Sequence, residues 1–210
     1  MYSCSSGFLV SYGAGKTTVL TMKGRRPFLP LPQENIVGVD TFKLFLPEYP
    51  AIRRVGDGRA SSLVQEEARK LSDSTFHLLI RMGRSFMWDS SMSDLEATRQ
   101  RIAAAKGHGY RLILVAVGCP IDAAIRKALY RAKQTRRFAH PAHLENSHRN
   151  FARAFDTYFD LFDQVMLFWN PWKPGDQPGQ PRLVAEKDGG VNSLVSYRGQ
   201  LEHFGALKEK

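Results

Sequence analysis

The stretch Gly13-Ala14-Gly15-Lys16-Thr17-Thr18 constrains the fold of this chain more than any other feature, because it follows the apolar run of residues 7–10 almost directly. A buried strand, a glycine-containing turn and a helix, in that order, form a loop whose backbone N–H groups face an anion. In such a loop Lys16 adds a point charge, and the Thr17 hydroxyl is suited to hold Mg²⁺. The segment therefore predicts a phosphate-binding loop built from residues 13–18.

The match to the full phosphate-loop pattern is incomplete. The pattern has a glycine six residues before the lysine, and this chain has Val10 there, followed by Ser11 and Tyr12. Two interpretations therefore stay open for the loop. It serves catalysis in one of them, and it only binds a phosphorylated ligand in the other.

The rest of the chain alternates apolar runs, bounded by turn residues, with helical patterns. This alternation is typical of an α/β fold, and we expect the three-layer α/β/α architecture of P-loop NTPases with a mostly parallel sheet. The predicted strands are 7–10, 35–39, 85–88, 111–117 and 164–169. The predicted helices are 16–22, 61–82, 94–106, 121–134 and 141–159.

The segment after the last parallel strand has a different character. Residues 170–181 contain four prolines and two glycines and predict a loop. Strands at 182–186 and 191–195 then flank Lys187-Asp188-Gly189-Gly190, which favours a C-terminal β-hairpin, and a short helix is expected at 199–207. We therefore expect a P-loop domain over residues 1–170, with residues 171–210 packed on the same domain.

Composition narrows the class of protein. A chain of 210 residues suits one domain, and its formal charge of +10 favours an anionic partner, either a multiply charged nucleotide or a nucleic acid. No apolar run is long enough for a membrane span, and the N-terminal residues do not resemble a signal peptide. Two cysteines fit a reducing, cytoplasmic compartment, and Cys119 is expected to be a buried thiol at the end of a strand.

Two acids are expected at carboxyl ends of strands, the edge where open α/β sheets bind ligands. Asp40 follows the strand 35–39 and would either accept a proton from a substrate hydroxyl or cap the next helix. Asp89 follows the strand 85–88 and is a candidate for contact with substrate or Mg²⁺. Capping of the helix that begins near Asp94 is expected from Ser93.

Three further groups have a functional and a purely structural interpretation. Glu66 and Glu67 on a helix are most often a solvated face, and His140, His143 and His148 lack the spacing of a zinc site. Arg131 and Arg137 belong to a basic cluster over residues 126–137. Arginines near a nucleotide neutralise charge on a transferred phosphoryl group, whereas a solvated or nucleic-acid-binding surface is the alternative.

Taken together, these residues resemble the zeta toxin family of P-loop kinases over residues 7–170. The resemblance lies in the following stretches: GAGKTT (13–18), VDTFKLFLPEY (39–49), VGDGRASSLVQEEA (55–68), WDSSMSD (88–94) and the run from 109 to 149. The order of these blocks is far more specific than the phosphate loop alone.

The resemblance implies transfer of the ATP γ-phosphate to a hydroxyl of a nucleotide sugar such as UDP-N-acetylglucosamine, with ATP and Mg²⁺ as cofactors. Lys16 would hold the β- and γ-phosphates, Thr17 would bind Mg²⁺, and Asp40 would be the catalytic base. On the substrate side the matching positions are Glu66, Glu67, Asp89 and Ser91, and the phosphate-sensing arginines match Arg131 and Arg137.

The chain also departs from the family pattern. Tyr12 stands in place of a usual proline, Ser93 in place of a substrate-contacting arginine, and Asp89 in place of a longer glutamate. These differences affect the expected binding of a sugar acceptor more than the expected binding of ATP. The alternative function is a divergent basic P-loop module that binds nucleotide or nucleic acid without catalysis, and a third is phosphorylation of an RNA or protein end.

Overall fold

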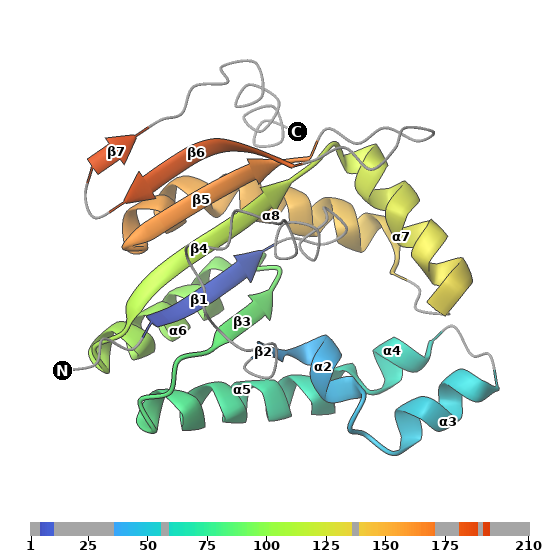
Figure 1. Ribbon diagram of the computed structural model, residues 1–210. Helices are drawn as coiled ribbons and strands as arrows, with labels where there is room; N and C mark the ends of the chain where they lie inside the picture. Colours follow the sequence, from blue (N-terminus) through green and yellow to red (C-terminus); the bar gives the residue numbers. More distant parts are fainter. Residues whose placement is uncertain are drawn as a thin grey trace.

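The sheet of this protein has seven strands in the order β2-β3-β1-β4-β5-β6-β7 (Figure 1). The computed structural model describes residues 5–10, 36–55, 59–135, 139–170, 181–188 and 191–193. Strands β1 to β5 pair in parallel, and β6 and β7 are antiparallel. The strand bounds are β1 (Ser5–Val10), β2 (Ile36–Gly38), β3 (Met87–Ser90), β4 (Arg111–Gly118), β5 (Gln164–Trp169), β6 (Arg182–Asp188) and β7 (Val191–Ser193).

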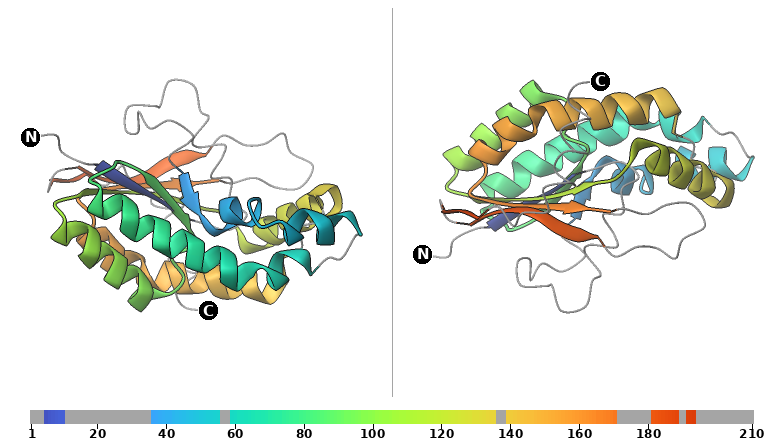
Figure 2. Two further views of the ribbon diagram at one scale, coloured as in Figure 1. Left: turned by 90° about the horizontal axis from the view of Figure 1, so that it is seen from below. Right: turned by 90° about the horizontal axis from the view of Figure 1, so that it is seen from above.

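Three long helices run along one face of the sheet, as both views of Figure 2 show for α5, α6 and α8. In α5 the buried positions are Ala68, Ser72, Phe76 and Ile80, and this spacing of four places them on one side of the helix. The helix bounds are α2 (Val39–Lys43), α3 (Glu48–Arg54), α4 (Ala60–Leu63), α5 (Gln65–Arg81), α6 (Leu95–Gly107), α7 (Ile121–Thr135) and α8 (Pro141–Leu161).

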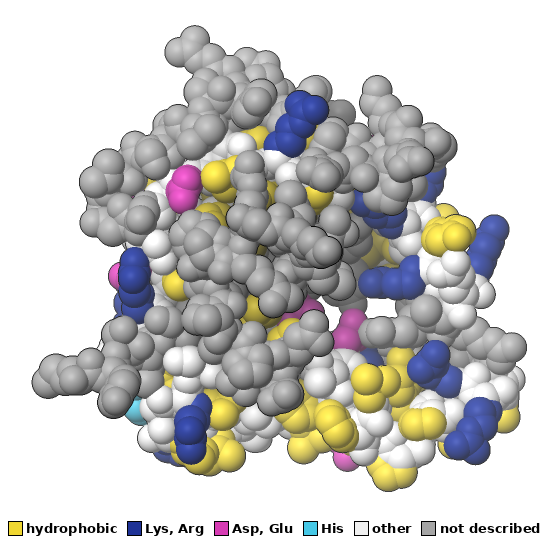
Figure 3. Space-filling view, viewed as in Figure 1, with side chains coloured by type: hydrophobic (Ala, Val, Ile, Leu, Met, Phe, Trp, Pro, Cys, Tyr) yellow, Lys and Arg dark blue, Asp and Glu magenta, His cyan; other side chains and the backbone are white. Residues whose placement is uncertain are grey.

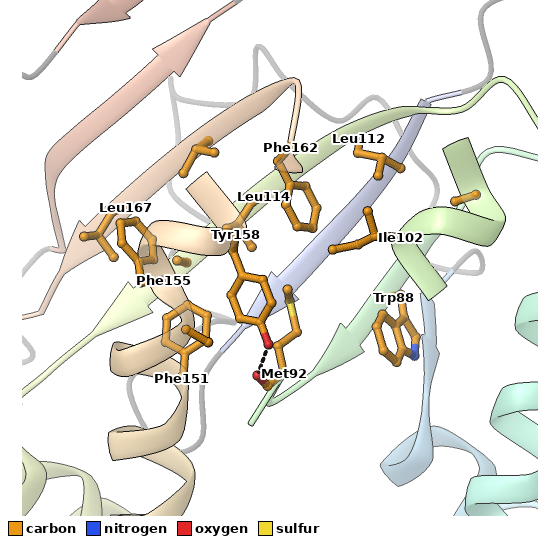
Figure 4. Packing of buried hydrophobic residues seen from close by; sticks show 14 of the residues in the cluster. Trp88, Met92, Ile102, Leu112, Leu114, Phe151, Phe155, Tyr158, Phe162 and Leu167 are labelled. Atoms are coloured by element: carbon orange, nitrogen blue, oxygen red, sulfur yellow. Dashed lines mark hydrogen bonds between the residues drawn. The ribbon is translucent and has the colours of Figure 1, made fainter. Parts of the chain in front are cut away.

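The core between these helices and the sheet is rich in aromatic side chains. Phe76 is fully buried, and its ring centroid lies 5.4 Å from that of Phe86 and 5.5 Å from that of Trp88. On the α8 side, Phe151 packs against Tyr158 with ring centroids 5.9 Å apart (Figure 4). Close packing of such large side chains removes a large apolar area from water on this face.

The opposite face of the sheet is also buried. Met87, Ile113, Val115 and Met166 form a second cluster there, and Ala124 of α7 packs into it. Burial on both faces explains why β4 and β5 are almost continuously apolar rather than alternating. The predicted α/β fold with a mostly parallel sheet is confirmed, while the expected helix 16–22 lies outside the described residues.

The C-terminal hairpin is part of the same sheet. The last pair of residues between β6 and β7 is Asp188 with Val191, so β6 continues two residues beyond the predicted strand 182–186. Lys187 belongs to the strand, and its Nζ donates hydrogen bonds to the carbonyl oxygens of Phe159 and Phe162, at 2.8 Å each. These carbonyls lie at the C-terminal end of α8, where a cation is favourable. The expected helix 199–207 lies outside the described residues.

The region between β2 and α5 differs from the sequence prediction. The expected helix 61–82 is divided into α4 and α5 at Val64, and the short helices α2 and α3 were not predicted. Val64 is buried in a small separate cluster with Leu46, Tyr49 and Ala60. Burial of these apolar residues, which are scattered over short segments, holds helices that are too short to form on their own.

The face that α7 turns inward also differs in part. From its helical spacing, the sequence predicts that Ala124, Ala128 and Leu129 face the sheet. Ala124 and Ala128 are buried, but Leu129 is 40% exposed, and Ala123 is buried in its place. Small alanine side chains allow a helix to approach a sheet closely, so the alanine stripe decides the rotation of α7. The prediction that Leu129 faces the sheet is therefore wrong.

Truncation of the aromatic core is expected to destabilise the protein strongly. Phe76→Ala should lower the free energy of unfolding by about 3–5 kcal/mol, because it leaves a cavity between α5 and β3. Leu78→Ala, on the exposed side of the same helix, should cost less than about 1 kcal/mol. Urea denaturation followed by circular dichroism compares the two variants. Equal losses would contradict this assignment of the core.

Candidate active site at the carboxyl edge of the sheet

The parallel strands bring their carboxyl ends to one edge of the sheet. Val10, the last residue of β1, pairs with Ser90 of β3 on one side and with Ala116 of β4 on the other. Since the chain reaches β4 only after building β2 and β3, it crosses β1, and this edge is a topological switch point. Open α/β sheets bind their ligands at such a point.

The phosphate-loop segment starts at this edge, because it follows Val10 in the sequence. Residues 11–18, including Lys16 and Thr17, lie outside the described residues. The roles assigned to residues 13–18 therefore stay predictions. The observed end of β1 fixes where the segment leaves the sheet, between the ends of β3 and β4.

Asp40 lies two residues beyond the end of β2, in the first turn of α2. The N-cap of α2 is Gly38, so the alternative in which Asp40 caps this helix is wrong. The Asp40 side chain is 47% exposed, and its Oδ1 accepts a hydrogen bond from Lys43 Nζ at 3.1 Å. The Asp40 carboxylate thus lies at the sheet edge, in contact with both solvent and a cation, and its role as base stays a prediction.

Lys43 is a member of this site that sequence reasoning missed. Its side chain is buried, and Nζ also donates a hydrogen bond to Ser61 Oγ at 2.7 Å. Two sequence signals point to it. Lys43 stands three residues after Asp40, on the same side of a helix, and its neighbours in the sequence are Phe42 and Leu44.

Asp89 lies inside β3 rather than after it. The predicted strand ended at Trp88, whereas parallel pairing with β1 continues to Ser90. Asp89 pairs with Gly38 of β2 across the other edge of β3. A Cβ on Gly38 would lie 3.0 Å from the Asp89 carbonyl oxygen and 3.1 Å from its Cβ, so glycine allows this close approach. Asp89 and the segment carrying Asp40 are therefore direct neighbours.

A tight turn follows Asp89 and holds Ser91. Met92 at its centre has φ 46°, and its backbone N–H donates a hydrogen bond to Ser90 Oγ at 3.2 Å. The buried Tyr158 hydroxyl donates to the Met92 carbonyl oxygen at 2.7 Å (Figure 4). Burial raises the pKa of Tyr158, so this hydroxyl stays protonated and keeps its role as donor. The turn is thus anchored to α8.

The cap of α6 corrects another expectation. Asp94, not Ser93, is the N-cap, and its Oδ1 accepts a hydrogen bond from the Ala97 backbone N–H at 3.0 Å. The Ser93 hydroxyl instead forms a hydrogen bond with the Ser91 hydroxyl at 3.0 Å. The helix begins one residue later than predicted, and this shift moves the cap to Asp94.

Glu66, Glu67 and Arg131 lie on exposed surfaces. Glu66 and Glu67 are in the first turn of α5, and Glu66 accepts a hydrogen bond from Arg69 at 2.6 Å. Arg131 is exposed near the end of α7, and Arg137 lies outside the described residues. In Figure 3 the surface is hollowed right of centre, and acidic as well as Lys or Arg side chains are visible around the hollow. Substrate roles for these residues stay predictions.

Most of the chain matches the model of one known protein family. The model of the family described as Zeta toxin matches residues 9–171, which include every strand from β2 to β5. The chain belongs to the zeta toxin family.

Solved structures share the fold. The chain is similar to a structure of the PezAT chromosomal toxin–antitoxin system of Streptococcus pneumoniae, with a TM-score of 0.63 and 16% identity, covering 99% of this chain and 86% of that one. It is also similar to AvrRxo1-ORF1:-ORF2 with ATP, with a TM-score of 0.73 and 18% identity, covering 98% of this chain and 64% of that one.

A curated relative is similar over a shorter stretch. It is the calmodulin calcium-dependent NAD kinase of Arabidopsis thaliana, 36% identical over 86 residues, which cover 41% of this chain and 15% of the relative. The match thus spans less than a sixth of that protein's length. Within the described part of this zeta toxin family member, no helix is both long and apolar enough to cross a membrane.

His140, His148 and Cys119 of this family member have structural surroundings. His140 Nδ1 accepts a hydrogen bond from the Ala142 N–H at 3.3 Å and caps α8, and His148 is buried. Among the described residues, no three His, Cys, Asp or Glu side chains gather as metal ligands. Cys119 is buried at the end of β4, as predicted, and burial raises the pKa of its thiol to about 12.

The contact between β2 and β3 is expected to tolerate no side chain at Gly38. Gly38→Ala should lower the free energy of unfolding by about 1–3 kcal/mol, because its Cβ meets backbone of an inner strand that has little room to move. The control is Gly107→Ala, since no atom lies within 4 Å of a Cβ at Gly107. This variant should be neutral or slightly stabilising. Thermal and urea denaturation measure both, and a neutral Gly38→Ala would contradict the close approach.

Proposed function

We propose that this protein is an ATP-dependent phosphotransferase that transfers the γ-phosphate to a hydroxyl of a small molecule. The observation that carries the proposal is the position of Asp40 and Asp89. Asp40 follows β2 and Asp89 lies near the end of β3, at the same edge of the sheet, and β3 pairs with β1, the strand that leads into the phosphate-loop sequence. Membership of the zeta toxin family supports the same reaction class.

In the proposed step, the acceptor hydroxyl oxygen forms a bond to the γ-phosphorus. The bond from that phosphorus to the bridging oxygen of ATP breaks, ADP leaves with the bonding electron pair, and the hydroxyl proton passes to the Asp40 carboxylate. The partial exposure of Asp40 supports this role, because a base must reach an acceptor that arrives from solvent.

The remaining residues would bind and orient the two substrates. We assign the phosphates of ATP to the backbone of residues 13–18 and to Lys16, and the acceptor to Asp89, Ser91, Glu66 and Glu67. Arg131 and Arg137 would neutralise charge on the phosphoryl group in transit.

A bound magnesium ion, held by Thr17 and phosphate oxygens, would neutralise phosphate charge. Magnesium in such sites takes one or two carboxylates besides phosphate oxygens. Asp89, which pairs with Gly38 near the end of β3, offers such a carboxylate at this edge, so its chemistry fits this ion, while Asp40 acts as the base.

Two acceptors have separate support. A nucleotide sugar such as UDP-N-acetylglucosamine follows from the resemblance of the Asp40 and Asp89 blocks to zeta toxins. NAD follows from the 36% identity over 86 residues to a protein named as an NAD kinase. A similar structure that was solved with ATP supports ATP as the donor, and similarity to a toxin–antitoxin system supports an antitoxin protein as partner.

The direct test is an acceptor screen. The purified chain is incubated with ATP, Mg²⁺ and a panel that contains UDP-N-acetylglucosamine, other nucleotide sugars and NAD, and the products are analysed by mass spectrometry. We expect one class of acceptor to gain a phosphoryl group in step with ADP release. ADP release without a phosphorylated acceptor would overturn the acceptor assignment. Failure to bind ATP would overturn the assignment of kinase activity.

Asp40→Asn and Lys16→Ala should separate chemistry from nucleotide binding. Asp40→Asn should lower turnover by about 10²–10⁴-fold with ATP affinity nearly unchanged, because the amide accepts no proton. Lys16→Ala should weaken ATP binding as well, since it removes a phosphate contact. Isothermal titration and steady-state kinetics measure both effects, with Asp160→Asn on the exposed side of α8 as the matched control. Full turnover in Asp40→Asn would remove Asp40 as the base.

A further inference from the structure

We propose that Lys43 is a positioning residue for phosphoryl transfer, which fixes the carboxylate of Asp40 and ties it to helix α4. The inference rests on the proposed role of Asp40 as the base. It concerns a side chain to which neither the sequence motifs nor the family resemblance assigns a role.

The burial of Lys43 is the first observation. The residue is 1% exposed and ranks among the largest fully buried side chains of the described chain. Removal of an ammonium group from water is unfavourable, and a buried ion pair often stabilises a protein no more than apolar residues of similar size. Stability alone is therefore a weak reason for a lysine here.

The contacts of Lys43 are the second observation. Nζ lies 3.1 Å from Asp40 Oδ1 and 2.7 Å from Ser61 Oγ. The pair is asymmetric, because the lysine side chain is 2% exposed and the aspartate side chain is 47% exposed. The cation thus contacts the carboxylate from the protein interior, while the carboxylate itself reaches the solvent side where an acceptor arrives.

The elements that Lys43 joins are the third observation. Helix α2 has five residues, which is too short for independent stability, and it carries Asp40. Ser61 belongs to α4, and α5 begins directly after it with Glu66 and Glu67 in its first turn. Figure 1 shows α2 beside α4 and the start of α5. One buried side chain therefore connects the proposed base with the helices that lead to the proposed acceptor site.

This arrangement has a specific kinetic consequence. A base that is held in one orientation has less freedom to lose as the reaction proceeds, and displacement by about 1 Å can cost on the order of 10²-fold in rate. Lys43 contacts Asp40 but belongs to neither the phosphate loop nor the turn at Ser91. Its removal should therefore lower kcat and leave ATP affinity and the KM for the acceptor nearly unchanged.

The experiment compares Lys43→Met with Lys70→Met, an exposed lysine of α5 that serves as the matched control. With the acceptor found in the screen, we expect Lys43→Met to lower kcat by about 10–100-fold and the control to keep wild-type kinetics. In the Asp40→Asn background, Lys43→Met should cause no further loss, because the two residues act as one unit. A tenfold further loss in that background would overturn the proposal.

Two further variants keep the test decisive if Lys43→Met folds poorly. Lys43→Arg retains a cation and should recover at least part of kcat, and Ser61→Ala, which removes only the link to α4, should lower kcat by a smaller factor. Wild-type kcat in Ser61→Ala would overturn the link to α4. If Asp40→Asn is fully active, the proposed base fails. If Asp40→Asn is inactive while Lys43→Met keeps wild-type kcat, only the Lys43 proposal fails.

Discussion

Parallel pairing of β1 with β3 and β4 is the constraint on which the rest of this structure depends. Because the three strands run in the same direction and in register, Val10, Ser90 and Ala116 lie side by side at one edge. Parallel pairing of β2 with β3 in turn places Asp89 beside Gly38, at the end of β2. Segments as far apart in the sequence as Val10 and Ala116 thus meet at this edge.

Packed side chains support the elements on both sides of this edge. Aromatic side chains such as Phe76 and Tyr158 pack α5 and α8 against the sheet, and the Tyr158 hydroxyl holds the turn at Met92. Beyond the strand ends, a small second cluster supports α2 to α4, with the charged pair of Lys43 and Asp40 beside it. Asp40 and Asp89 therefore stand on supported elements rather than on an isolated loop.

The sequence predicted long, strongly periodic elements well, and it predicted short segments poorly. Strand 164–169 and the start of α7 agree with the structure, and α8 differs only at its end. The division of helix 61–82 at Val64 and the helices of 39–54 were missed, because they depend on burial against distant residues. Of the candidate site residues, Asp40 and Asp89 are brought to one edge. Lys16 and Arg137 lie outside the described residues.

By itself, the sequence determined the local chemistry and the class of fold. An apolar strand followed by GAGKTT predicts a phosphate loop, and alternating apolar runs predict a mostly parallel sheet, because both are encoded by residues close together in the chain. Tertiary structure alone decided that Asp94 rather than Ser93 caps α6, that Asp89 lies within β3, and that Lys43 is buried against Asp40 and Ser61. Strand register and burial of a charge depend on contacts between distant segments, and no local pattern specifies them.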